Sequence, residues 1–146
     1  MKLKQLQLLT HLRSNSRAKL TSISRQTSIP ISTLFDMLKE LQTSLISRST
    51  ILLNFEELGY HTRAQVFLRT TNKEKLQKHL MCHPNVNDIY KINNGWNFVI
   101  QTIHKNVKEL DIFIEHMKEK YGVEESQIHY LIDDIKREGF FIEEYN

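Results

Sequence analysis

Residues 20–39 read LTSISRQTSIPISTLFDMLK, and this stretch decides the fold of the first third of the chain. Its apolar residues have the spacing of two short helices packed together, with small or polar residues where the backbones approach. Pro30 falls between the helices, where its missing N–H costs little. Thr21 and Ser32 are the predicted N-caps. The spacing predicts a helix-turn-helix, whose core positions are Ile23, Ile29, Leu34 and Met37.

Positive charge is concentrated in the same part of the chain. Residues 1–50 hold eight Lys and Arg residues and two acidic ones, a formal charge of +6, whereas residues 51–146 carry −3. A local excess of positive charge that coincides with a helix-turn-helix favours binding to the phosphates of double-stranded DNA. The alternative is a solvated basic face without a partner, or a helical hairpin unrelated to DNA.

Length and composition restrict the class of protein. A chain of 146 residues forms one domain or two small ones. The single cysteine, Cys82, excludes an internal disulfide and fits a reducing compartment. No apolar run is long enough for a membrane-spanning helix, and residues 1–13 lack the apolar region and cleavage site of a signal peptide. We therefore expect a cytoplasmic protein without a membrane partner.

The segments on both sides of residues 20–39 extend this motif into a domain. Leucines at helical spacing predict a helix over 2–13, and with helices at 21–27 and 32–42 it makes a unit of three helices. Short β-type runs at 46–49 and 51–53 predict a two-stranded wing. Gly59 ends a connector that begins at residue 54. The expected organisation is a winged helix-turn-helix over 1–50, a linker over 51–60 and a second domain over 61–146.

The second domain alternates strand-like and helix-like periodicity. Strands are predicted over 64–70, 86–92, 96–103 and 127–135, and helices over 72–81 and 107–121. Asn94-Gly95 predicts a type I′ turn between the middle strands. The order β-α-β-β-α-β predicts a ferredoxin-like α+β fold, with two helices on one face of a four-stranded antiparallel sheet. Its other face would be bare in a monomer, which favours a homodimer formed sheet to sheet.

Four stretches in this order resemble the Lrp/AsnC, or feast/famine, family of transcription regulators. They read LTSISRQTSIPISTLFDMLKEL, ISRSTILLNFEELGY, HPNVNDIYKINNGWNFVI and VKELDIFIEHMKEKYGV. The segment HPNV, followed by a hairpin and a Gly-aromatic pair, is the most specific. The resemblance covers nearly the whole chain. It implies a winged helix-turn-helix, a dimerising and ligand-sensing ferredoxin-like domain, even-numbered oligomers and modulation by amino acids.

The resemblance also implies a DNA-binding surface. Met37 stands where many family members have an arginine, and we expect it to face the core. Because the recognition helix holds one Lys and two acids, most phosphate contacts are assigned outside it, to Arg13, Arg17, Lys19, Arg25 and Arg48. The exposed positions of the recognition helix match Ser32, Thr33, Phe35, Asp36 and Lys39.

The family's effector position is the hairpin, where the pattern is Gly, an aromatic residue and Asp. This chain has Gly95, Trp96 and Asn97 there. An Asp could pair with the ammonium of an amino acid, and a neutral Asn pairs less strongly. Three alternatives remain: the ligand differs, Asp88 supplies the charge, or no effector binds. Trp96 could stack on a planar ligand or pack across the sheet.

Other kinds of site are less well supported by the sequence. His79, Cys82 and His83 are closely spaced, but Pro84 follows and no second ligand cluster completes a metal site. No phosphate-binding glycine loop, nucleophile elbow or catalytic acid pair is present, so neither an enzyme nor a cofactor is expected. Two alternatives stay open. One is a sirohaem-decarboxylase-like enzyme using His61, Arg63, His104 and His129; the other is a paralogue that only oligomerises through its sheet.

Overall fold

The computed structural model describes residues 2–140 and residue 142, and the chain divides into two compact units. The first contains the residues up to Leu52 together with the described residues from Lys136 onward. The second runs from Leu53 to Ile135. The second unit ends at Ile135, whereas the second domain expected from the sequence runs to residue 146.

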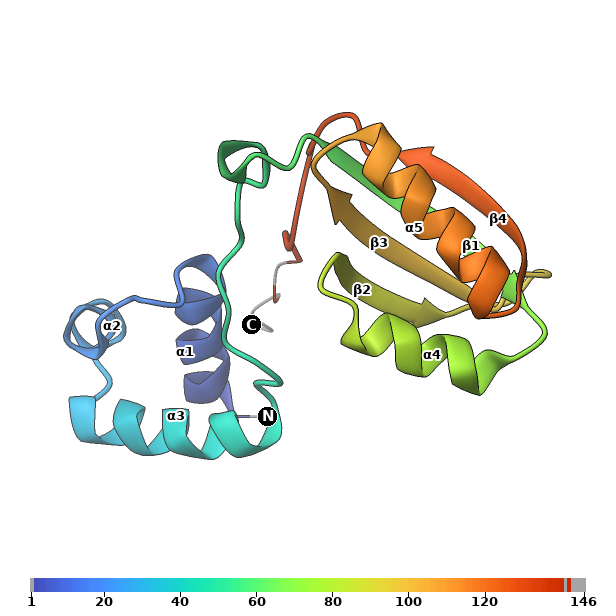
Figure 1. Ribbon diagram of the computed structural model, residues 1–146. Coiled ribbons are helices and arrows are strands. Elements are labelled where there is room, and N and C mark those ends of the chain that lie inside the picture. The colour runs from blue at the N-terminus through green and yellow to red at the C-terminus, as the bar shows by residue number, and fades with distance from the viewer. Residues whose placement is uncertain (1, 141, 143–146) are drawn as a thin grey trace. The chain divides into compact units, whose positions relative to one another are not determined.

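Three helices build the first unit, and Figure 1 shows them at the blue end of the chain. They are α1 (Leu3–Ser14), α2 (Leu20–Thr27) and α3 (Ile31–Ser44). Their core is formed by Leu8, Leu9, Ile23, Ile29, Leu34 and Leu41. Met37 is half-buried against this core, so the prediction that it faces inward is confirmed. The helix-turn-helix therefore forms as the spacing of residues 20–39 predicts.

The turn between α2 and α3 is held by small polar side chains. Ser28 ends α2 in the left-handed conformation, with φ of +60°, and its N–H donates to the Ser24 carbonyl oxygen at 2.8 Å. The Ser24 hydroxyl in turn donates to the Ile29 carbonyl oxygen at 2.5 Å. The predicted caps are shifted: Lys19 and Pro30 stand at the N-caps, so Thr21 and Ser32 lie inside the first turns.

The predicted wing does not form. Residues 46–54 contain no strand, which corrects the expectation of paired strands at 46–49 and 51–53. Ile51 is 69% exposed and Leu52 53% exposed, so neither side chain gains burial. A two-stranded hairpin needs cross-strand packing or a supporting surface to be stable, and the exposed Ile51 and Leu52 gain neither.

The second unit is a four-stranded antiparallel sheet with the strand order β2-β3-β1-β4. The strands are β1 (Thr62–Thr70), β2 (Val86–Lys91), β3 (Phe98–His104) and β4 (Val123–Tyr130). Helices α4 (Lys73–Cys82) and α5 (Val107–Lys120) lie on the same face of this sheet (Figure 1). A short 3₁₀ helix, η1 (Glu56–Leu58), precedes β1. The ferredoxin-like α+β prediction is confirmed.

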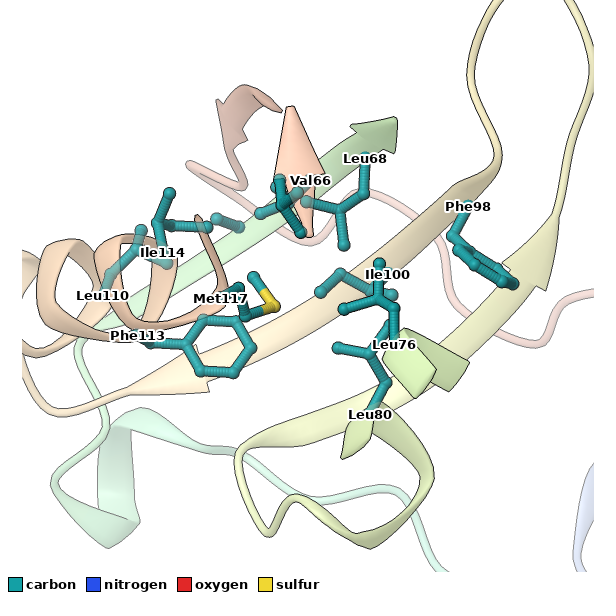
Figure 2. Close-up of a cluster of buried hydrophobic side chains, with 12 residues drawn as sticks. Val66, Leu68, Leu76, Leu80, Phe98, Ile100, Leu110, Phe113, Ile114 and Met117 are labelled. Carbon is teal, nitrogen blue, oxygen red and sulfur yellow. The ribbon is translucent and has the colours of Figure 1, made fainter. Parts of the chain in front are cut away.

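The core of this unit lies between the sheet and its two helices. Figure 2 shows Phe113 and Met117 of α5 and Leu76 and Leu80 of α4 gathered over Ile100 of β3. Alternate residues of β1 point into the same cluster, as a strand with one covered face requires. The opposite face of the sheet carries no helix of this unit.

One strand is displaced from its predicted position, and one turn is as predicted. β4 begins at Val123, directly after Gly122, rather than at residue 127, and it ends at Tyr130 rather than residue 135. Asn94 and Gly95 both have positive φ, +61° and +86°, as a type I′ turn requires. β2 and β3 pair antiparallel on either side of this turn, which confirms the hairpin.

Candidate DNA-binding surface and ligand sites

One side of α3 carries an exposed stripe of polar and aromatic residues. Ser32, Phe35, Asp36 and Lys39 fall at i, i+3, i+4 and i+7, and all are exposed, whereas Thr33 is half-buried. Phe35 is 52% exposed, and the Lys39 Nζ lies 5.4 Å from the centre of its ring. Leu34 and Leu41 anchor the opposite side in the core. The helix can therefore present this stripe to a groove of DNA without losing packing.

The basic residues assigned to phosphate contacts occupy different parts of the first unit. Arg17 and Lys19 are exposed just before α2, and Arg25 is exposed in the last turn of that helix. Arg48 is exposed in the strandless segment after α3. Arg13 differs, because its Nη2 pairs with the Glu138 Oε2 at 3.2 Å and its Nε donates to a carbonyl oxygen of the same segment. Its guanidinium is thus engaged within the protein.

The side chain of Asn97 has a structural partner. Its Oδ1 accepts the Thr70 backbone N–H at 2.8 Å, and its own N–H donates to the Leu68 carbonyl oxygen at 2.8 Å. These bonds join the start of β3 to the end of β1, where the pairing register of β1 with β4 shifts. The Asn97 Oδ1 therefore already accepts one structural hydrogen bond before any ligand binds.

Trp96 packs across the open face of the sheet. Its ring lies 5.9 Å from that of Phe67, and the Arg69 guanidinium lies 5.6 Å from its centre. His129 of β4 meets the other edge of this group, with its ring 5.6 Å from Phe67. Arg69 also pairs with Glu125 of β4. Trp96 is thus held by Phe67 and Arg69 of β1, and the neighbouring Gly95 adopts the positive φ that the turn requires.

Asp88 does not lie beside the hairpin turn. It pairs with Gln101 across β2 and β3, three strand positions from the last pair, Lys91 with Phe98. At about 3.3 Å per residue this is about 10 Å along the strand. Its Oδ2 accepts from Asn87. Asp88 and Asn97 therefore do not form one compact charge site within a single chain.

Sequence reasoning missed a histidine cluster between α4 and α5. The His79 ring lies 5.4 Å from His83, 5.8 Å from His116 and 3.8 Å from Tyr121, on which it stacks at 14°. Burial lowers the pKa of His79, and the neighbouring His83 and His116 lower it further. The i, i+4 spacing of His79 and His83 was visible in the sequence. The convergence of His116 and Tyr121, from a helix far along the chain, was not.

This cluster is not arranged as a metal site. Across residues 2–140 and 142, no three His, Cys, Asp or Glu side chains are placed to hold an ion together. Cys82, the last residue of α4, is exposed.

The residues named for the enzyme alternative do not converge. His104 is 2% exposed and lies against Phe113, on the face that the helices cover. His129 lies against Phe67 on the open face. Arg63 pairs through Nη2 with Asp134 at 3.0 Å. A catalytic set drawn from both faces of one sheet could not surround one substrate, so this geometry does not favour the alternative.

No helix within the described part of the chain has both the length and the apolar character to span a bilayer.

Solved structures of transcription regulators have the same architecture over nearly the whole chain. A Neisseria meningitidis transcriptional regulator, solved as an L-Met complex, matches with a TM-score of 0.86 and 16% identity, over 94% of this chain and 93% of that one. LrpC of B. subtilis gives 0.83 with 15% identity, over 93% and 96%. AsnC of E. coli gives 0.80 with 13% identity, over 94% and 95%.

This chain has the Lrp/AsnC fold. No family model matches the sequence. Among curated proteins, an uncharacterised HTH-type transcriptional regulator of Pyrococcus horikoshii is 20% identical and covers 90% of each chain. The HTH-type transcriptional regulator FL11 of Pyrococcus furiosus is 26% identical and covers 77% of each. The Lrp/AsnC fold and these relatives agree with the resemblance seen in the sequence.

Proposed function

We propose that this protein is a transcription regulator of the Lrp/AsnC type that binds double-stranded DNA through its first unit. The observation that carries the proposal is the exposed stripe of α3, from Ser32 to Lys39, on a helix-turn-helix that coincides with the +6 charge of residues 1–50. Its curated relatives are named as HTH-type transcriptional regulators. The stripe would read base edges, and the surrounding basic residues would contact phosphates.

A binding experiment tests the DNA-contacting residues. DNA is first selected from a random library by the full chain, and affinity is then measured by fluorescence anisotropy over a series of salt concentrations. The double variant Arg25→Ala with Lys39→Ala should bind more weakly. Its slope of log affinity against log salt should be shallower by about one for each bound protomer, because Arg25 is assigned to a phosphate contact and each lost phosphate contact removes about one.

The control removes the same charge from the second unit. Lys105 and Lys108 are exposed beside the start of α5, and changing both to Ala should leave the salt slope as in the wild type. If the two double variants lose the same affinity, the effect is one of net charge, and the assignment of α2 and α3 as the DNA-binding surface is wrong.

We also propose that the protein forms a dimer through the open face of the sheet. This face carries Phe67 at its centre and Tyr90, which is 62% exposed, at its edge. Light scattering should give at least twice the 17.4 kDa chain mass. Tyr90→Glu should shift the protein towards the monomer, because it places a charge in the contact. Ile112→Glu, at an exposed position of α5, is the matched control. A wild-type monomer at micromolar concentration would contradict the proposal.

A small-molecule effector at the hairpin is the third part of the proposal. The Neisseria neighbour was solved with L-Met. In the present chain, Asn97→Asp would keep one oxygen for the Thr70 N–H and direct the second towards a ligand ammonium. A charge-assisted hydrogen bond contributes about 1.5–3 kcal/mol, or about one to two powers of ten in affinity. Calorimetry with the twenty amino acids should detect this gain. Identical flat titrations for both proteins would exclude an amino-acid site at Asn97.

A further inference from the structure

An open groove on the second unit is lined by cationic and titratable side chains that the DNA-binding proposal does not use. It has a volume of about 470 Å³ and lies along α4, with Tyr121 at the end of α5 as part of its wall. Lys75, Lys78, His79 and His83 contribute to its lining. No acidic residue among those described lines it. The groove therefore has the electrostatic character of a site for an anion.

The lysines are positioned without a carboxylate partner. The Lys75 Nζ lies 5.6 Å from the centre of the Tyr121 ring, a cation–π arrangement that holds the ammonium over an aromatic floor. In the part of the chain that the structure describes, neither Lys75 nor Lys78 has a carboxylate within ion-pair distance. Their charge is thus available to an incoming ligand.

A buried polar atom beside the lysines also lacks a partner. The His79 Nε2 is inaccessible to solvent and makes no hydrogen bond within the described residues. The ring cannot turn freely, because it stacks on Tyr121 at 3.8 Å. A ligand in the groove would not touch this nitrogen directly, but a negative charge close to the ring would favour the protonated form of the imidazole.

We propose that this groove binds a small oxyanion, the carboxylate or phosphate group of a metabolite, through Lys75 and Lys78, beside the ring of His79. The two ammonium groups supply the charge that binds the anion, and the bound anion in turn stabilises the protonated form of the neighbouring imidazole. This inference does not depend on DNA binding. It concerns the helix-covered face of the unit, whereas the hairpin and the open face belong to the effector and dimer proposals.

Anion binding at this site should be coupled to protonation of His79 and His83. Burial lowers the pKa values of His79 and His83, with His116 of α5 lowering both through repulsion. Lys75 and Lys78 of α4 add further positive charge, and Cys82 and Tyr121 are the other titratable groups of the lining. Glu109 acts on His104 rather than on either groove histidine. A bound anion offsets this repulsion, so it should raise both pKa values and bind several-fold more tightly at pH 6 than at pH 8.

The test is a proton NMR titration of the histidine rings in the full chain. Resonances are assigned with single His→Gln variants, and pH titrations are run in inorganic phosphate, in acetate and in chloride at equal ionic strength. We expect a saturable upward shift of the pKa of His79 and of His83, and none for exposed His61, with phosphate, acetate or both. A response to phosphate alone identifies a phosphate site, and a response to acetate alone identifies a carboxylate site.

Paired variants show whether the lysines are responsible. Lys75→Gln with Lys78→Gln should abolish the shift, whereas Lys73→Gln with Lys108→Gln removes the same charge from exposed positions outside the groove and should preserve it. All four lysines are exposed, so neither pair should impair folding. The proposal is overturned if chloride reproduces the shift, or if the Lys75 and Lys78 pair responds as the wild type does.

Discussion

Asn97→Ala removes the acceptor that joins the start of β3 to the end of β1. In the wild type, the Asn97 Oδ1 accepts the Thr70 N–H at 2.8 Å, and Thr70 is only 8% exposed. The Thr70 hydroxyl is already used, since it donates to the Gly122 carbonyl oxygen at 3.0 Å. The variant therefore leaves a largely buried backbone donor without a partner, at the point where the sheet register shifts.

The free-energy cost of Asn97→Ala follows from the lost hydrogen bond to the Thr70 N–H. An unsatisfied buried donor costs about 1–3 kcal/mol. Because Asn97 itself is half-buried, water can partly reach the vacated position, so we expect a loss of about 1–2 kcal/mol in the free energy of unfolding of the second unit. For a unit of this size, each kcal/mol lowers Tm by about 4–8 °C.

Thermal and urea unfolding of the full chain, followed by the fluorescence of Trp96, measures this loss, since Trp96 is the single tryptophan and lies next to Asn97. Asn97→Asp keeps an acceptor and should match the wild type within about 0.5 kcal/mol. Asn93→Ala, at an exposed position of the same hairpin, is the control for a simple truncation. The reasoning is refuted if Asn97→Ala is as stable as Asn93→Ala.

Three further predictions concern burial, backbone conformation and protonation. Leu34→Ala, at a fully buried position, should cost the first unit about 2–5 kcal/mol and abolish DNA binding, while Trp96 fluorescence of the second unit stays unchanged. Gly122→Ala should destabilise the second unit by about 1–2 kcal/mol in urea unfolding, because φ there is +69° and the new Cβ would lie 3.0 Å from the Thr71 hydroxyl. Burial holds the pKa of His104 below its unfolded value of 6.5, so its contribution to stability is complete above that pH and is lost as the pH falls towards the folded pKa. Urea midpoints should fall between pH 7.5 and 5.5, less so in His104→Asn, and equal slopes in both proteins would contradict this.

Periodicity in the sequence was enough to predict the helices and the order of strands. The pattern of α5, with Leu110, Phe113, Ile114 and Met117 on one side, corresponds directly to the buried residues of that helix. Asn94-Gly95 located the hairpin, because few other residues adopt positive φ at two successive positions. In these places a local chemical preference and the tertiary fold require the same structure.

The sequence-based predictions were wrong or incomplete where contacts with distant segments, rather than the local sequence, determine the structure. β4 is an edge strand that pairs only with β1, so its exposed side chains are polar and its pattern is weak. The prediction followed the alternation of Ile128, Tyr130 and Ile132 instead, and Ile132 is 94% exposed. The partner of Asn97 and the surroundings of His79 depend on segments distant in the sequence. No local pattern encodes those contacts.

The return of the last described residues to the first unit has a consequence for the order of folding. Ile142 packs against the core that includes Leu8 and Leu34, and Glu138 forms an ion pair with Arg13. A ribosome makes α1, α2 and α3 before the second unit, yet the contacts of Glu138 and Ile142 cannot exist until the entire ferredoxin-like unit has been synthesised. The first unit therefore completes its contacts only after the second unit has been made. The same topology joins the two units by two covalent crossings of the chain, near residues 52 and 136, rather than by one.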